Sequence, residues 1–247
     1  MNNEVNNRYL ILGFQGGWEP RWSRIPDGIE AAVRHTLDER WGIPAPWGAC
    51  DSGVDLESQG THVLRAWAQV ELGVRDSTST DDVPAAGLLR TIWDTLEIFG
   101  RPSISGVRAI VPLVCAGEQL LRRVVSSILP RRGTGTPRQR VLIQLDRAWP
   151  TNPPILWQSS SILESMTSLT NAEVVTSEDT RTPNAVSAFP TPFASVDART
   201  FGIEAGLPAW TVDDAGWLVE AVSLACHRAG IAADMQIALT PKTNPSA

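Results

Sequence analysis

Tryptophan is the residue type whose number and spacing most suggest a functional site in this chain. Ten Trp stand against one Tyr and five Phe, and four of the ten fall within thirty residues of one another. Indole rings can wall a ligand cleft or anchor a protein interface, and a guanidinium can stack on their faces. The sequence therefore predicts a binding site built from Trp18, Arg21, Trp22, Trp41 and Trp47.

A purely structural role for the same rings is the alternative. Trp149, Trp157 and Trp210 are rough counterparts of the cluster later in the chain, and most of these Trp lie outside the segments with clean strand periodicity. Large rings can plug the ends of a thin helix-on-sheet layer, where an aliphatic side chain would cover too little area. Removal of such a plug unfolds the protein, whereas removal of a surface anchor weakens only binding.

No catalytic or metal-binding motif accompanies the tryptophans. The chain has no G-x-S-x-G, H-E-x-x-H, C-x-x-C or phosphate-loop pattern, so no nucleophile, metal ligand or cofactor is predicted. Of the three histidines, His35 is expected to be solvated on a helix and His62 to lie at a sheet rim. His227 is expected in the last turn of a helix, where a cation suits the helix dipole. The catalytic residues of any enzyme activity stay unassigned.

A glycine-rich segment follows the first predicted strand. Gly13, Gly16 and Gly17 could bring backbone N–H groups close to a phosphate. The next predicted helix begins about ten residues later, and neither Lys nor Ser/Thr follows in the phosphate-loop position. A flexible turn is therefore favoured, and residues 15–24 are expected to form a loop.

Hydrophobic periodicity predicts the elements that must position these residues. In the first half it indicates a strand over 9–14, a helix over 27–41, an uncertain strand within 46–57, a half-buried strand over 62–72, a helix over 83–99 and a strand over 105–113. This order is the ferredoxin-like βαββαβ pattern.

The second half repeats the same order of elements. The patterns indicate strands over 141–145, 172–176, 193–203 and 231–239, with helices over 155–169 and from 212 onward, the latter capped by Thr211-x-x-Asp214. Two sequence echoes support a duplication. Arg8–Pro20 resembles Arg140–Pro150 at an offset of 131–132 residues, and Ala86–Leu89 resembles Ala215–Leu218 at an offset of 129.

The predicted fold is accordingly α+β, with two tandem ferredoxin-like lobes that form a pseudo-dimer. The first lobe spans residues 1–113, a basic helix and loop connector spans 114–140, and the second lobe spans 141–247. Edge-to-edge or face-to-face pairing of the two sheets would cover surfaces that a single four-stranded sheet leaves exposed. The Arg131–Arg140 part of the connector has almost no apolar content and is expected to be dispensable for folding.

Charge and cysteine content constrain the partners and the compartment. The first lobe carries 10 Arg against 15 acidic residues and the second 5 basic against 11 acidic, while the connector carries 6 Arg against one Glu. Two acidic lobes argue against general nucleic-acid binding, which requires a broad cationic face. Three widely spaced cysteines and a polar N-terminus predict free thiols in the cytoplasm, and no apolar run is long enough to span a membrane.

Two functions from different classes follow. The first is a non-catalytic cytoplasmic interaction protein, a neutraliser or scaffold, that presents the Trp-rich loops to a protein partner or a small apolar or aromatic ligand. The second is a cofactor-independent small-molecule enzyme of the dimeric α+β barrel type, cyclase- or monooxygenase-like, with an aromatic-walled pocket worked by a carboxylate or His62. The tandem plan is shared by such enzymes, by RNA-processing endonucleases and by binding proteins, so the fold alone does not select between them.

Overall fold

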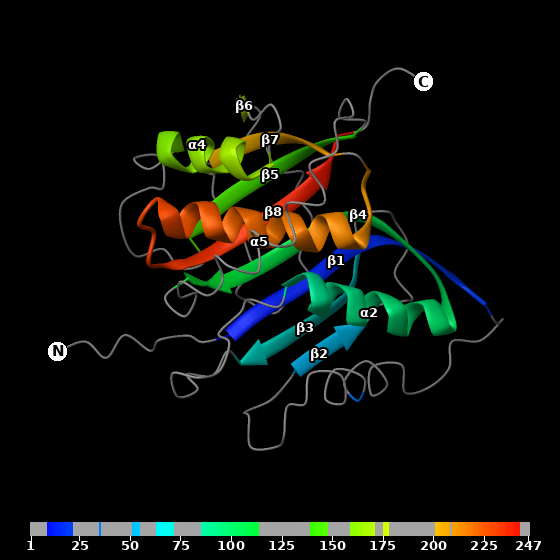
Figure 1. Cartoon of the computed structure of the whole chain (residues 1–247). Helices are drawn as coiled ribbons and strands as arrows, with labels where there is room; N and C mark the ends of the chain where they lie inside the picture. The colour runs from blue at the N-terminus through cyan, green and yellow to red at the C-terminus, as the bar shows by residue number, and fades with distance from the viewer. Residues whose placement is uncertain are drawn as a thin grey trace.

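The computed structural model describes residues 9–21, 35, 51–54, 63–71, 85–113, 139–147, 159–170, 175–177, 201–207 and 209–242. Its elements are β1 (Tyr9–Pro20), β2 (Asp51–Val54), β3 (Leu64–Glu71), α2 (Ala85–Phe99), β4 (Gly100–Pro112), β5 (Gln139–Arg147), α4 (Ser159–Thr170), β6 (Val175–Ser177), β7 (Phe201–Leu207), α5 (Val212–Arg228) and β8 (Asp234–Pro241). The fold is α+β, as the periodicity predicts (Figure 1).

The eight described strands belong to one antiparallel sheet in the order β2-β3-β1-β4-β8-β5-β7-β6. The two halves of the chain meet at the centre, where β4 pairs with β8 from Val107↔Leu239 to Pro112↔Asp234. From this β4–β8 seam outward, the order is β4-β1-β3-β2 on one side and β8-β5-β7-β6 on the other. Each side therefore contains the fourth, first, third and second strands of its half.

Three described helices cover one face of the sheet (Figure 1). α2 packs over β1 and β4, α4 over β7, and α5 lies between the two helices over β4 and β8. The core forms between this helical layer and the sheet, because alternate residues of every central strand point toward the helices. In β4 these residues are Val107, Ala109 and Val111.

The opposite face of the sheet is also buried at its centre. Arg65 and Arg108 are only 4% and 7% exposed there, and Ile11 and Ile110 are 4% and 1% exposed. The expectation that β3 is half-buried is therefore wrong at Arg65. Its guanidinium Nε donates a 2.7 Å hydrogen bond to the backbone oxygen of Gly16, which satisfies a polar group that the strand pattern alone would leave in water.

The expected loop over residues 15–24 is wrong for its first six residues. Strand β1 continues through Pro20 and pairs with β4 from Gln15↔Gly106 to Pro20↔Gly100, with a bulge between Gln15 and Gly16. A Cβ at Gly16 would collide with the backbone oxygen of Ser103. Glycine here permits close approach of two strands, not a flexible turn.

The other described elements agree with the periodicity in type and differ mainly in length. The apolar stripe that the periodicity predicts for α2 is buried at Ala85, Leu88, Leu89, Ile92 and Leu96, while its last member, Phe99, is only partly buried. α5 begins at the predicted cap, where the Thr211 hydroxyl accepts a hydrogen bond from the Asp214 N–H at 3.2 Å. Gln139 and Arg140 belong to β5 and not to the connector.

Several predicted segments lie outside the described residues. They are most of the helix over 27–41, the connector from 114 to 138 and the segment from 178 to 200. Trp149 also lies outside, so the pairing of Trp18 with Trp149 has no structural comparison. The division into two lobes with a connector stays a prediction. No helix in the described part of the chain has the length and apolarity to cross a membrane.

Candidate functional site

The predicted Trp-rich site maps to a two-stranded ribbon that continues past the rest of the sheet. β3 pairs with β1 only as far as Gln15, and β8 pairs with β4 only from Val107 onward. Residues 16–20 and 100–104 consequently pair only with each other among the described strands. In Figure 1 this β1–β4 ribbon runs out beyond β3 and ends beside the last turn of α2.

Trp18 lies in this ribbon, opposite Pro102, and is half-buried. Its indole ring lies against Gly100, where any Cβ would collide with the ring atoms Cε2 and Nε1. The indole Nε1 is buried and has no hydrogen-bond partner among the described residues. One side of the ring therefore packs as a structural plug would, while its only donor is unsatisfied, a state that costs about 1–3 kcal/mol.

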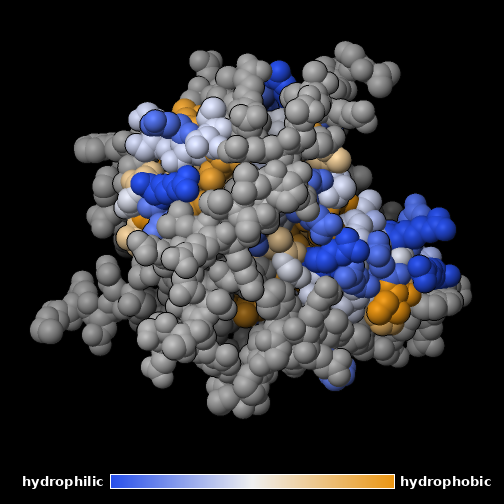
Figure 2. All heavy atoms as spheres, in the orientation of Figure 1, coloured by the Kyte–Doolittle hydropathy of each residue, from blue (hydrophilic) through white to orange (hydrophobic). Residues whose placement is uncertain are grey.

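The tip of the ribbon exposes both charge and apolar surface. Arg21 is exposed, and its backbone N–H donates a 3.1 Å hydrogen bond to the backbone oxygen of Phe99. Ile98, which precedes Phe99 in α2, is 57% exposed. Glu19 and Arg101, which are register partners in the ribbon, are exposed as well. Figure 2 shows a hydrophobic area flanked by hydrophilic side chains over this end of α2.

Of the predicted site residues, Trp18 lies in the ribbon and Arg21 directly follows it; that they form one binding site stays a prediction. Trp22, Trp41 and Trp47, the other predicted members of the site, lie outside the described residues. Their place in the site stays a prediction.

The remaining described tryptophans have structural contacts, and Trp67 packs against the buried Ile11, Leu64 and Ile110. Trp210 Nε1 donates a 3.1 Å hydrogen bond to the backbone oxygen of Ile104 in the other half of the chain. The Trp93 ring lies 5.5 Å from that of Phe14, while Trp217 is 6% exposed. For these rings, the structural role is the better description.

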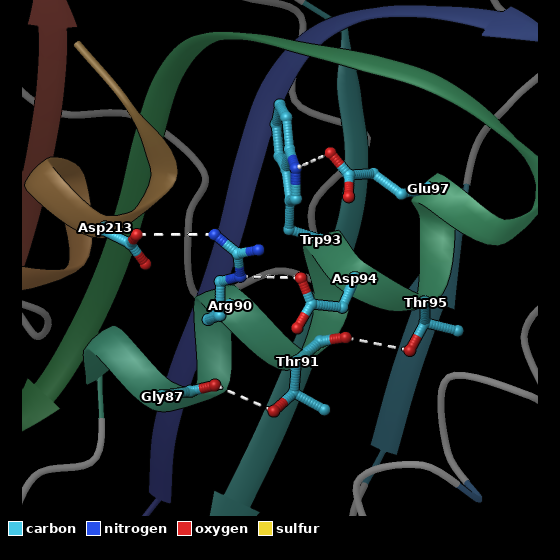
Figure 3. A network of polar contacts seen from close by, with 8 residues as sticks. All are labelled: Gly87, Arg90, Thr91, Trp93, Asp94, Thr95, Glu97 and Asp213. Atoms are coloured by element: carbon cyan, nitrogen blue, oxygen red, sulfur yellow. Dashed lines mark hydrogen bonds and ion pairs between the residues drawn. The ribbon is translucent and has the colours of Figure 1, made fainter. Parts of the chain in front are cut away.

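A network of ion pairs and hydrogen bonds follows the outer side of α2 (Figure 3). Arg90 donates through Nε to Asp94 Oδ1 at 2.6 Å and through Nη1 to Asp213 Oδ2 of α5 at 3.4 Å. Trp93 Nε1 donates to Glu97 Oε1 at 2.7 Å. The Arg90 side chain is 42% exposed, so water screens these pairs and each contributes up to about 1 kcal/mol. The network ties α2 to α5 and leaves Arg90 already engaged by two carboxylates.

The sequence assigned no catalytic residues, and they stay unassigned. His35 is exposed on its helix, as expected, and no cluster of potential metal ligands occurs within the described residues. Cys226 is a free, fully buried thiol, as predicted, and burial raises its pKa to about 12. A thiol with that pKa is neutral and unreactive near pH 7. Cys50 and Cys115 lie outside the described residues.

Three buried polar residues form a cluster that sequence reasoning missed. Arg108 of β4, Gln144 of β5 and Gln236 of β8 are 7%, 3% and 5% exposed. All three occupy strand positions that point away from the helices, because their sequence neighbours belong to the core. Burial lowers the pKa of Arg108. The sequence signal was a polar residue in the middle of an apolar strand, as in VRAIV and VLIQL.

Searches against family models, curated proteins and solved structures found no match for this chain.

Proposed function

We propose that this chain is a non-catalytic cytoplasmic binding protein built from two ferredoxin-like lobes, residues 1–113 and 141–247, that share one sheet. The repeated strand order on the two sides of the β4–β8 seam supports the duplication, as do the sequence echoes at offsets of 129–132 residues. Edge-to-edge pairing explains why neither β4 nor β8 is an exposed edge, which would otherwise invite aggregation. The odd cysteine count supports the compartment.

The observation that carries a binding role is the β1–β4 ribbon. Within the described residues, it brings Trp18, Arg21 and the exposed Ile98 to one place outside the main sheet. An isolated two-stranded ribbon is marginally stable in water, so its apolar side chains gain stability when a partner covers them. Aromatic and arginine side chains are also the residue types that most often dominate interface energies.

The partner that fits this surface is a folded protein. The exposed residues of this end are the apolar Ile98 and the charged Arg21, Arg101, Glu19 and Glu97, a composition that suits an apolar interface core inside a polar rim. Binding of a small apolar or aromatic ligand alone is the competing outcome. In that case, changes to the charged rim residues would not alter binding.

A matched pair of charge-reversal variants tests this proposal. Arg21→Glu combined with Ile98→Asp changes only exposed side chains at the ribbon, and Arg228→Glu changes an exposed arginine in the last turn of α5. Wild type and both variants are used as bait in cells that produce the protein, with quantitative mass spectrometry of what each retains.

The proposal predicts a protein that wild type and Arg228→Glu retain and that the ribbon variant loses by at least about tenfold, the effect of one hot-spot residue. Circular dichroism and Tm are expected to be the same for all three proteins. Equal retention by the ribbon variant, or no specific protein retained by wild type, would contradict a protein-binding role for the ribbon.

A further inference from the structure

The face of the sheet opposite the helices carries a concentration of unpaired hydrogen-bond donors next to the β4–β8 seam. Within the described part of the chain, Arg108 makes no ion pair and no hydrogen bond, and burial is the cause of its lowered pKa. The Nε2 atoms of Gln144 and Gln236 are buried and have no hydrogen-bond partner. All three side chains are more than nine-tenths buried.

Strand register brings these donors around one small residue. Ala238 of β8 lies directly between Arg108 of β4 and Gln144 of β5, and Gln236 is two positions along β8 and so on the same face. Neighbouring strands are about 4.8 Å apart, and diagonal cross-strand neighbours are about 7–8 Å apart. Arg and Gln side chains are long enough to reach a common point above the Ala238 methyl group.

The opposite side of Arg108 is filled. Its register partner on β1 is Gly13, where an added Cβ would lie 2.9 Å from Trp67 Cβ and 3.0 Å from Leu64 Cδ1. Leu64 and Trp67 form an apolar cluster there with Ile11 and Ile110. This apolar cluster itself offers Arg108 no acceptor. One described acceptor on this side is Gln15 Oε1, which lies beside Gly106, two positions before Arg108 on β4, and Arg108 makes no hydrogen bond to it.

A carboxylate is present on this face but is engaged elsewhere. Asp146 of β5 lies across from Gln236 and has an interaction of its own, whereas Arg108 has none that involves it. A buried arginine keeps its charge, and burial of an unpaired charge or donor is costly. Donors without acceptors are complementary to an acceptor-only group.

We propose that Arg108, Gln144 and Gln236 form a binding site for the oxyanion of a small molecule, a carboxylate or a phosphate. Arg108 supplies the charge and a planar pair of N–H donors that match two oxygens of such a group. The two Gln amides donate to the remaining lone pairs. The Ile11, Leu64, Ile110 and Trp67 cluster borders the site, so an anion with an apolar body is favoured over a bare ion. This site is separate from the β1–β4 ribbon.

The test measures anion binding to the full-length protein by isothermal titration calorimetry and thermal shift. The probes are phosphate, phenyl phosphate, acetate and benzoate, with benzamide as the uncharged relative of benzoate and sodium chloride at equal ionic strength as the reference. The phosphate and carboxylate arms identify which oxyanion the site prefers. The phenyl derivatives test whether the apolar cluster contributes.

Arg108→Met is the central variant because it keeps the length of the side chain and removes the charge. The expected result is a loss of anion affinity of at least about tenfold, together with an unchanged or higher Tm in the absence of anion, since replacement of a buried charge by an apolar group is often stabilising. Arg228→Gln removes an exposed arginine from the last turn of α5 and is expected to bind like wild type. Gln144→Leu and Gln236→Leu are expected to weaken binding while they preserve folding, because their Nε2 atoms lose no partner.

Three results would overturn the site. In the first, no probe raises the Tm of wild type above the chloride reference. In the second, Arg228→Gln loses binding as much as Arg108→Met, which indicates general surface electrostatics. In the third, Arg108→Met and both Gln variants lower the Tm without anion, which means that the three side chains satisfy one another in the protein. If Arg108→Met does not fold, the two Gln variants decide the outcome. The charge-reversal variant of the β1–β4 ribbon is expected to bind anions normally, so each proposal can fail alone.

Discussion

Substitution of Gly216 tests the packing that joins the two halves of the chain through their helices. Gly216 lies in α5, and a methyl group built on it would overlap Ala86 Cα and lie 3.0 Å from Ala86 Cβ and 3.2 Å from the Ala86 backbone nitrogen. Real Cβ atoms do not approach backbone this closely, so α2 and α5 would have to separate in the Gly216→Ala variant. The contact is with backbone, and no rotation of a side chain can relieve it.

Two effects of opposite sign decide the magnitude. Alanine in place of glycine inside a helix stabilises it by about 1 kcal/mol. Against this, overpacking of a filled core costs about 1–3 kcal/mol. Separation of the helices also strains the hydrogen bond from the Ala86 N–H to Glu220 Oε1, now 2.9 Å, and a hydrogen bond to a charged group contributes about 1.5–3 kcal/mol. The net expectation is a destabilisation of about 2–3 kcal/mol.

Chemical unfolding in urea, followed by far-ultraviolet circular dichroism, measures the change, and Tm is expected to fall by about 5–10 °C for a chain of this size. The Ala86→Gly, Gly216→Ala double variant is the control. It removes the methyl–methyl contact but not the overlap with Ala86 Cα, so it should recover none of the lost stability. A Gly216→Ala protein that is about 1 kcal/mol more stable than wild type would mean that helix propensity alone acts here, and the close crossing of α2 and α5 would be refuted.

Three further predictions concern a buried thiol, a helix cap and the connector. Because burial raises the pKa of Cys226 from 9.0 to about 12, the unfolded state loses this proton first as pH rises. The free energy of unfolding should then fall between pH 9 and 12 by up to about 1.4 kcal/mol per pH unit more in wild type than in Cys226→Ala; parallel pH profiles from urea titrations would show that the thiol is not the cause. Thr211→Ala removes the acceptor of the Asp214 N–H and should cost about 0.5–2 kcal/mol, and an unchanged urea midpoint would indicate that another group caps α5. Deletion of residues 131–138, which stops before β5, should change stability by no more than about 1 kcal/mol, and loss of folding by circular dichroism would show that this segment packs against the lobes.

Local sequence patterns predicted the helices and strands that are defined by interactions between residues close together in the chain. The apolar stripe of α2 and the Thr211-x-x-Asp214 cap of α5 identify helices because the interactions concerned are three or four residues apart. The closing strand β8 is visible in the same way, from the alternation of Met235, Ile237 and Leu239. Burial of one side of each element is a local property, so the sequence alone reports it.

Features that depend on pairing across the chain were not predictable in this way. Gln15–Pro20 has the glycine content of a loop, yet β4 supplies its partners from 80 to 91 residues further along the chain. The glycines are needed for the approach of the two strands, and composition does not distinguish that use from a turn. For the same reason β3 looked half-buried, because nothing in its own sequence shows what covers Arg65.

The Arg108, Gln144 and Gln236 cluster combines both situations. Each residue is detectable alone as a polar position in an apolar strand. Their proximity requires the registers of β4 with β8 and of β8 with β5, which bring together positions that are 36 and 92 residues apart along the chain. The Trp cluster, in contrast, was predicted because its members are close in sequence. Closeness in sequence is weaker evidence for closeness in space than strand register is.

The proposed duplication gives a physical reason why only one arginine lies at the seam. Arg108 faces Ala238 across the β4–β8 pair, and these positions are 130 residues apart, the same offset that separates Gly100 from Gly230 after the two helices. In two identical lobes the same residue would therefore face its own copy across the axis. Two arginines opposite each other would repel at a Cβ separation of about 4.5–5.5 Å, and two alanines would provide no charge. The proposed oxyanion site needs one guanidinium opposite a small residue, so it can form only if the two copies have diverged at this position. Because the lobes are covalently linked, one Arg and one Ala can occupy the two equivalent positions of the seam.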